Sequence, residues 1–377
     1  MTSNRIRDFL ATRRPEGPCL VVDLDIVRRN FLRFEKAFPA TGIFYAVKAN
    51  PAPEILRLLA SLGSSFDTAS VAEIEMVLAT GAAPDRISYG NTIKKERDIA
   101  RACELGVTLF AVDSVEEVEK IARQAPGARV FCRVLTDGVG AEWPLSRKFG
   151  CTPEMSIKVL TTAHRLGLEA YGLSFHVGSQ QGNPLAWDTA VAESAAVFKT
   201  LSEANINLSM LNLGGGFPTR YLRDMPSTAT YARSIQGSIR RHFGNRLPWT
   251  IVEPGRAMVG NAGVIKTEVV LISRKSDDDD KRWVYLDIGK FGGLAETMDE
   301  SIRYPIVTPH DNDPMAPCVI AGPTCDSADV LYEKTPYPLP LTLQIGDELL
   351  IEATGAYTTT YSSVAFNGFP PLTTYVI

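Results

Sequence analysis

The chain has 377 residues, of which 45% are apolar and 22% are charged. Domains run to roughly 100–200 residues, so this length predicts one large barrel or two domains. The formal net charge of −4 argues against a general nucleic-acid binder, which needs a basic surface. No apolar stretch approaches the roughly 18 residues of a membrane span, and the arginine-rich N-terminus lacks the apolar core of a secretory signal. We expect a cytoplasmic protein with neither a membrane nor a nucleic-acid partner.

The six cysteines include no C-x-x-C pair, and the four histidines form neither H-E-x-x-H nor H-x-H. A disulfide framework and a structural zinc site are therefore not expected. A histidine-built metal centre is not expected either.

Short β-rich runs alternate with helical patterns from about residue 40 to residue 255. The predicted strands cover 43–49, 65–68, 87–89, 109–112, 130–135, 172–177, 208–213 and 250–252. The helical patterns between them cover 52–62, 71–80, 94–105, 115–123, 153–166, 184–204 and 229–243. Eightfold alternation of this kind predicts a (β/α)8 barrel, with a doubly wound open sheet as the alternative.

The pattern changes after residue 260. β-branched runs at 264–273, 282–287, 318–320 and 348–353 are separated by turns, and prolines crowd 305–317 and 336–340. Helical periodicity is nearly absent there. This part of the chain predicts a C-terminal all-β domain.

Polar side chains stand where the predicted barrel strands end. They are Lys48, Asp67, Arg133, His176, Gly214–Gly216 and Glu253. The chemistry of such barrels sits at the C-terminal ends of the strands. The sequence therefore predicts that these residues line one active site.

Lys48 lies in an otherwise apolar strand, where a lysine is costly unless it is used. Desolvation lowers the pKa of a lysine amine and makes it a Schiff-base nucleophile. The alternative is a strand-end lysine whose amine simply reaches solvent.

A strand that runs into Gly214-Gly215-Gly216 allows backbone N–H groups to approach a phosphate closely. The pattern is not G-x-G-x-x-G, so a dinucleotide is not indicated. A plain tight turn is the alternative. The next strand ends in Glu253-Pro254-Gly255-Arg256, and the two segments together could hold a phosphate at one end and a ring nitrogen at the other.

Three further segments carry reactive groups. His176 could stack on a planar cofactor and Ser179 could bind phosphate, although a lone histidine is more often structural, and no G-x-S-x-G surrounds Ser179. Cys325 beside Asp326 suits proton transfer and cation binding, with an incidental surface turn as the alternative. Tyr357 offers a phenol near the C-terminus.

These blocks, taken in order, resemble a known family. The matching segments are Tyr45-Ala-Val-Lys48, Phe66-Asp-Thr-Ala-Ser70, Phe175-His-Val-Gly-Ser179, Gly214-Gly-Gly-Phe-Pro218, Glu253-Pro-Gly-Arg256, Gly322-Pro-Thr-Cys-Asp326, Gly355-Ala-Tyr357 and Phe366-Asn-Gly-Phe369. The chain resembles the fold-type III pyridoxal-phosphate decarboxylases of ornithine, lysine, arginine and diaminopimelate, and most closely the ornithine branch. The resemblance spans nearly the whole chain.

The resemblance implies an alanine racemase-like (β/α)8 TIM barrel over residues 21–258 that binds pyridoxal 5'-phosphate. It also implies a β domain built from residues 1–20 and 259–377, which contributes to the active site of a homodimer.

The resemblance assigns roles by position. Lys48 corresponds to the lysine that bonds the cofactor, Glu253 to the carboxylate on the pyridinium nitrogen, and His176 to the ring-stacking histidine. Asp67 and Arg133 correspond to residues that support this network. The phosphate cradle corresponds to Ser179, Gly214, Gly215, Gly216, Gly255, Arg256 and Tyr357. Cys325, the candidate acid that returns a proton to Cα, corresponds with Asp326 to residues supplied by the partner subunit.

An acid after the cysteine points to a substrate with a cationic side-chain end. The resemblance places a second acid between residues 290 and 304, where Asp299 is the first choice, Glu296 the second, and Glu300 a third candidate. The alternative is that all three decorate an exposed turn. Phe366 completes the expected substrate contacts.

The expected reaction converts L-ornithine to putrescine and CO2 in polyamine biosynthesis, with L-lysine to cadaverine as a second possibility. Diaminopimelate and arginine decarboxylases are the alternatives within the family. An amino-acid racemase would need a weaker electron sink than Glu253 implies. An inactive regulatory homologue would be expected to lose Lys48 or Cys325, and both are present.

Overall fold

Eight parallel strands close into a barrel, in the order β10-β11-β2-β3-β4-β5-β6-β8. The computed structural model describes residues 2–143, 148–279 and 281–377. The barrel strands are β2 (Thr41–Ala46), β3 (Ser65–Thr68), β4 (Ile87–Tyr89), β5 (Leu109–Val112), β6 (Arg129–Arg133), β8 (Glu169–Ser174), β10 (Met210–Asn212) and β11 (Trp249–Val252). The predicted (β/α)8 barrel is confirmed, and the open-sheet alternative is wrong because β11 pairs with β2 and closes the sheet.

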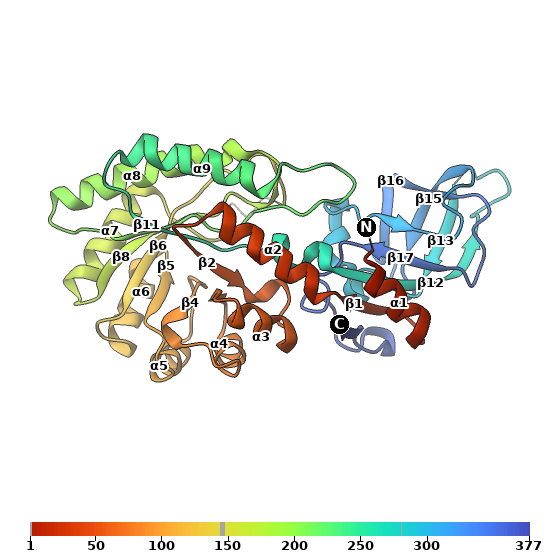
Figure 1. The fold of residues 1–377 in the computed structure, drawn as a ribbon, viewed down its shortest axis with the longest axis horizontal. Helices are drawn as coiled ribbons and strands as arrows, with labels where there is room; N and C mark the ends of the chain where they lie inside the picture. The colour runs from red at the N-terminus through yellow and green to blue at the C-terminus, as the bar shows by residue number, and fades with distance from the viewer. Residues whose placement is uncertain (1, 144–147, 280) are drawn as a thin grey trace. The chain divides into compact units, whose positions relative to one another are not determined.

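Helices cover the outside of the barrel strands (Figure 1). They are α2 (Leu24–Ala37), α3 (Pro53–Ser61), α4 (Val71–Leu78), α5 (Glu96–Glu104), α6 (Val115–Gln124), α7 (Pro153–Arg165), α8 (Trp187–Glu203) and α9 (Thr228–Phe243). Several begin at a side-chain cap: the Ser70, Ser114 and Thr152 hydroxyls accept backbone N–H groups of the first turns of α4, α6 and α7. Each such cap contributes about 1 kcal/mol, so the sequence itself marks where these helices start.

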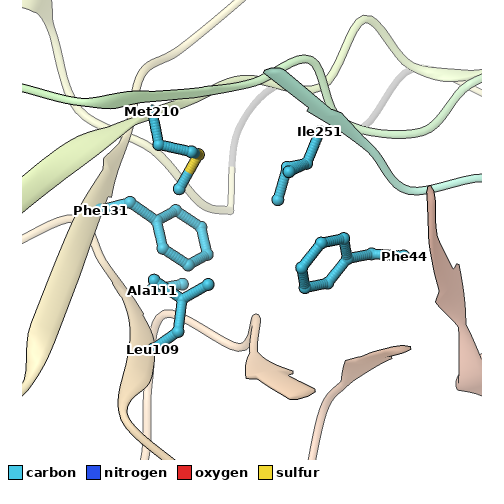
Figure 2. Close-up of a cluster of buried hydrophobic side chains, with 6 residues drawn as sticks. All are labelled: Phe44, Leu109, Ala111, Phe131, Met210 and Ile251. Atoms are coloured by element: carbon cyan, nitrogen blue, oxygen red, sulfur yellow. The ribbon is translucent and has the colours of Figure 1, made fainter. Parts of the chain in front are cut away.

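The barrel interior is a packed apolar layer. Figure 2 shows side chains from five strands pointing toward one another: Phe44, Leu109, Ala111, Phe131, Met210 and Ile251. All six are buried. Because side chains of a strand alternate between its two faces, the residues two positions further along each strand face the same interior, one layer nearer the strand ends.

The second part of the chain is β-rich, as predicted. Its strands are β1 (Cys19–Val22), β12 (Gly263–Ser273), β13 (Arg282–Leu286), β14 (Ile306–Val307), β15 (Met315–Ala321), β16 (Val330–Pro340), β17 (Glu348–Glu352) and β18 (Thr373–Val376). The sheet runs β14-β17-β12-β13-β15-β16, with β1 pairing β12 and β18. Short 3-10 and π-helical turns fill Lys290–Leu294 and Ala295–Glu300, so this part is not purely β.

The N-terminal segment joins this sheet. β1 pairs antiparallel with β12 and parallel with β18, and α1 (Asn4–Arg13) buries Ile6 against Cys19, Val21 and Val264. The chain accordingly divides into two compact units. The β-rich unit contains the residues up to Val27 together with Thr219–Asp224 and Met258–Ile377, and the barrel unit contains Arg28–Pro218 and Met225–Ala257. The functional domain limits given above stay a prediction.

The proline cluster at 336–340 belongs to a strand, which the sequence pattern did not indicate. β16 carries Pro336, Pro338 and Pro340, and among the described strands it pairs only with β15, at the end of the sheet order. A proline cannot donate a ladder hydrogen bond, so it is tolerated on such an edge strand.

All six cysteines are free thiols. The sulfurs of Cys132 and Cys151 lie 3.5 Å apart in the barrel unit. Within the described residues, no helix is long and apolar enough to cross a membrane, and no group of three or more His, Cys, Asp or Glu side chains could hold a metal ion.

The interior layer makes a stability prediction. Phe131→Ala should lower the free energy of unfolding by about 3–5 kcal/mol, because it deletes a buried ring and leaves a cavity. Leu247→Ala, in the same unit but at a side chain that is 54% exposed, should change it by less than about 0.5 kcal/mol. Urea unfolding followed by circular dichroism measures both, and equal effects would contradict the assignment of this layer as the core.

Candidate active site

The polar residues of the barrel rim follow directly after the interior layer, and they include Asn212, which was not among the predicted site residues. Arg133, Asn212 and Glu253 come two residues after Phe131, Met210 and Ile251, which face the interior. Asp67 pairs in register with Ala46 of the neighbouring strand. The alternation of a strand therefore aims these polar side chains inward at the C-terminal rim of the barrel, where barrel enzymes keep their chemistry.

Lys48 and Asp67 form the centre of this rim. The Lys48 Nζ lies 3.5 Å from the Asp67 Oδ2, and the lysine side chain is 50% exposed while that of Asp67 is 5% exposed. Burial raises the pKa of Asp67, and the Lys48 charge opposes that shift. The ion pair holds the lysine amine in place and leaves it accessible to a small molecule.

A glycine makes room for the Asp67 carboxylate. A Cβ atom added at Gly90 would lie 1.9 Å from the Asp67 Oδ1. The Ser88 hydroxyl donates to the same oxygen at 3.3 Å. Residues 88 and 90, at and just after the end of β4, therefore fix the acid that faces Lys48.

Glu253 follows β11 and faces the same rim. Its Oε1 accepts a hydrogen bond from the Asn212 amide at 2.5 Å. Burial, followed by the nearby Asp67 charge, raises the pKa of Glu253 to about 7. A carboxyl of this kind gains most from a positively charged partner, because such a partner restores its ionised form.

Arg133 and His176 complete the rim. Burial lowers the pKa of the Arg133 guanidinium, and the charges of Glu253 and other acids oppose that effect. Burial, together with the Arg133 and Lys48 charges, lowers the pKa of His176 well below its usual value. The His176 Nδ1 accepts the Gly178 N–H at 3.0 Å, so the neutral ring carries its proton on Nε2. A neutral imidazole suits stacking on an aromatic ring.

The three glycines form a cradle that no larger residue could form. Gly214 and Gly216 have φ angles of 66° and 93°, and added Cβ atoms would lie 2.1 Å and 2.5 Å from the carbonyl oxygens of Phe175 and Gly178. Beside this turn, the buried Arg256 donates to the Ser179 Oγ at 3.1 Å. Backbone N–H groups, a hydroxyl and a guanidinium are the donors that a phosphate group requires.

The remaining predicted residues lie in the β-rich unit. Tyr357 adopts a left-handed φ of 57° after β17. Cys325 and Asp326 are exposed, and the Asn367 Oδ1 accepts both the Cys325 N–H at 3.0 Å and its thiol at 3.4 Å. Thr324 and Phe366 line a cavity of about 260 Å³, where the Phe366 ring lies 4.7 Å from that of Phe291.

The three candidate acids between residues 290 and 304 occupy different environments. The Asp299 side chain is 88% exposed and lies 3.3 Å from the Lys334 amine. Glu300 accepts backbone N–H groups of residues 333–335 and pairs with Arg303 at 3.0 Å, so it holds β16 in place. Glu296 is buried, unlike an acid on an exposed turn. The roles of Asp299 and Glu296 stay predictions.

Three residues near these groups were missed by the motif reading. Asn212 contacts Glu253 and Asn367 contacts Cys325. Glu73 accepts the Ala69 N–H at 2.7 Å, and its pKa is raised by burial and by the nearby Asp67 charge. The inward position of Asn212, two residues before Gly214, could have identified it, because a buried strand amide needs partners.

The fold is that of a barrel enzyme, and its rim holds an accessible lysine amine paired with a buried acid, a second buried acid and a histidine. A glycine turn with a nearby guanidinium stands at the same rim. The family model "Pyridoxal-dependent decarboxylase, pyridoxal binding domain" matches residues 24–260. The chain belongs to this family of pyridoxal-dependent decarboxylases, and the predicted cofactor is thereby confirmed. The residues present fit it, since an amine, a carboxylate and a phosphate cradle stand at one rim.

Three similar proteins match the chain over most of their length. The chain is 36% identical over 361 residues to the lysine/ornithine decarboxylase of Selenomonas ruminantium, covering 96% of this chain and 89% of that protein. It is 35% identical to the ornithine decarboxylase of Schizosaccharomyces pombe (93% and 81%) and 34% identical to antizyme inhibitor 2 of Xenopus laevis (93% and 78%).

Solved structures of decarboxylases have the same fold as this chain. SrLDC in complex with PLP and cadaverine superimposes with a TM-score of 0.88 at 34% identity, covering 100% of this chain and 94% of that one. The arginine decarboxylase of Paramecium bursaria Chlorella virus bound to agmatine gives a TM-score of 0.90 at 27% identity, covering 99% of both chains. The chain is thus a member of the basic amino-acid decarboxylases.

The space beside Asp67 makes a second prediction. Gly90→Ala should weaken the binding of pyridoxal phosphate and destabilise the fold by roughly 1–3 kcal/mol, because the added methyl group displaces the carboxylate that faces Lys48. Gly237→Ala is the matched control: Gly237 lies within α9, and nothing stands within 4 Å of an added Cβ.

The control should stabilise the fold by roughly 0.5–1 kcal/mol, because alanine is the better helix former. Thermal unfolding and a fluorescence titration with the cofactor measure both variants. Equal behaviour of the two variants would contradict the packing described for Asp67.

Proposed function

We propose that the chain decarboxylates L-ornithine to putrescine and CO2 in polyamine biosynthesis and accepts L-lysine, giving cadaverine, as a second substrate. The observation that carries the proposal is the joint presence of the Lys48–Asp67 pair at the barrel rim and an exposed Cys325-Asp326 turn in the β-rich unit. The relatives named lysine/ornithine and ornithine decarboxylase support it.

The proposal gives each residue of the barrel rim a role in binding or activating the cofactor. Lys48 supplies the amine that bonds the cofactor. Asp67 holds that amine, and its negative charge compensates the positive charge of the lysine. Glu253 would hold the ring nitrogen of the cofactor and keep it protonated. Neutral His176 would pack on the cofactor ring without adding charge. Bound pyridoxal phosphate supplies a sink for the electron pair left on Cα when CO2 departs.

The phosphate end fixes the geometry. Gly214–Gly216, Ser179, Gly255 and Arg256 bind the phosphate in one orientation, with Tyr357 as a further contact. Residues that hold the cofactor in one place would also orient the substrate bonded to it, and such orientation can supply a large part of a catalytic effect.

The β-rich unit supplies the substrate side. Cys325 donates the proton that replaces CO2 on Cα, and the Asp326 carboxylate pairs with the distal ammonium of the substrate. Asp299, or else Glu296, provides a second acid, and Phe366 packs on the methylene chain. Because Cys325 and Asp326 are exposed in the chain, we propose that they act in the site of a partner subunit, within a cytoplasmic homodimer.

One alternative from another class is favoured by a specific finding. Antizyme inhibitor 2 of Xenopus laevis is a relative at 34% identity, so an inactive regulatory homologue is the competing proposal. Lys48 and Cys325, the residues that such a homologue has least reason to keep, are both present here. An amino-acid racemase is disfavoured because Glu253 strengthens the electron sink.

The substrate proposal predicts a ranking of kcat/KM. The kcat/KM for ornithine should exceed that for lysine by roughly 10–200-fold at most, because one methylene group is worth about 1–3 kcal/mol in a binding pocket. Arginine and diaminopimelate should be poorer, because one has a bulkier end and the other a second carboxylate. CO2 release and product chromatography measure all four. A preference for diaminopimelate or arginine would reject the proposal, and an absence of any turnover would favour the regulatory homologue.

The shared-site proposal predicts complementation. Lys48→Ala and Cys325→Ala should each be nearly inactive alone. When the two are mixed and allowed to exchange subunits, half of the dimers carry one intact site of two, so about a quarter of the wild-type activity should return. The control is a mixture of Lys48→Ala with itself. If activity does not return while capture of differently tagged subunits shows exchanged dimers, both residues belong to one subunit's site.

A further inference from the structure

Asn212 is tied to Glu253 more closely than any other described residue of the rim. It is fully buried on β10. Its Oδ1 accepts the Gly214 N–H at 2.9 Å, and its Nδ2 donates to the Glu253 Oε1 at 2.5 Å. The Glu253 N–H also donates to the Gly214 carbonyl oxygen at 2.9 Å. Backbone and side chain of the acid are thus both held by the segment 212–214.

The orientation of the Asn212 amide is fixed by chemistry. A backbone N–H can only donate, so the side-chain oxygen of Asn212 must face Gly214 and its NH2 group must face Glu253. After this N–H the chain turns at Gly214 with a φ of 66°. An added Cβ there would lie 2.1 Å from the Phe175 carbonyl oxygen, so the turn requires glycine.

This polarity has a consequence for Glu253. An N–H donor at Oε1 requires a lone pair there and stabilises the ionised carboxylate. It works against burial and against the Asp67 charge, both of which favour the protonated form. Any proton that Glu253 takes up is directed to Oε2. The Asn212 amide therefore keeps Oε1 of Glu253 unprotonated and leaves Oε2 as the oxygen that can take a proton.

We propose that Asn212 is a positioning residue that occupies the Glu253 Oε1 and keeps Glu253 ionised, leaving Oε2 to pair with the ring nitrogen of the cofactor. The inference rests on the role proposed for Glu253. It extends that role to Asn212, which holds Glu253 through its side-chain amide. The amide, rather than a carboxylate of the same shape, is the essential feature.

Asn212→Asp tests this polarity without changing the shape of the side chain. The introduced carboxylate still accepts the Gly214 N–H, but it places an acceptor against Glu253, so the two acids must share a proton. At neutral pH the single negative charge of this pair is divided between the two acids, and Glu253 carries a full charge only when the shared proton leaves at higher pH. Asn183→Asp is the matched control: Asn183 is exposed and its Oδ1 accepts the Leu185 N–H.

The first readout is the dissociation constant of pyridoxal phosphate between pH 6 and pH 9. Asn212→Asp should raise it by about tenfold or more at pH 6.5, the effect of a one-unit pKa change, and should approach the wild-type value at pH 9. Asn183→Asp should follow the wild type throughout. A loss of affinity that is equal at every pH, or no loss, would overturn the proposal. Because no amino acid is present, the result does not depend on which substrate the chain takes.

The second readout is a double-mutant cycle on the melting temperature of the cofactor-loaded chain at pH 8. Asn212→Asp should lower it markedly in the wild-type background. It should cost little in a Glu253→Gln background, because that amide can turn and donate to the introduced acid. A purely packing role predicts the same loss in both backgrounds. If Asn212→Asp alone does not fold, a folded double variant supports the proposal and failure of both refutes it.

Discussion

The closure of eight parallel strands is the constraint on which this site depends. Closure forces alternate residues of every strand into one interior, so that the apolar layer of Phe44, Phe131 and Ile251 and the polar rim above it are built by the same periodicity. Lys48 and Asp67 meet because β2 pairs with β3. Glu253, far away in the sequence, reaches the same rim because β11 pairs with β2. The stability of the apolar layer is therefore what holds charges together at the rim.

The barrel rim holds several ionisable side chains that are largely buried, and the charges of its acids and of its bases partly compensate one another. Burial pushes Asp67 and Glu253 toward their neutral forms and lowers the pKa values of Arg133 and His176. A ligand that brings both a cationic group and an anionic group suits such a rim, because the cation favours the ionised acids and the anion favours the charged guanidinium groups. The electrostatics thus favour the cofactor that the family match assigns.

Much of this could be predicted from the sequence, because strand ends and glycine turns leave local signals. Lys48, Glu253 and the three glycines were found at their strand ends for that reason. Asn212 was not, since one asparagine in an apolar run gives no sign of its partner 41 residues away. The strand character of 336–340 was hidden because proline patterns predict turns. Glu300 could not be separated from Asp299 until its backbone partners in β16 were visible.

Exposure distinguishes the two groups of candidate residues in a way that composition could not. Acids and bases of the barrel rim are partly or fully withdrawn from water, whereas Cys325 and Asp326 stand at the surface of the β-rich unit. Asn367 nevertheless orders the thiol by accepting both its backbone N–H and its S–H. Fixing an exposed side chain in one position costs conformational entropy. That cost brings no benefit unless the side chain has a role. That order supports the proposal that Cys325 meets its target only when a second surface covers it.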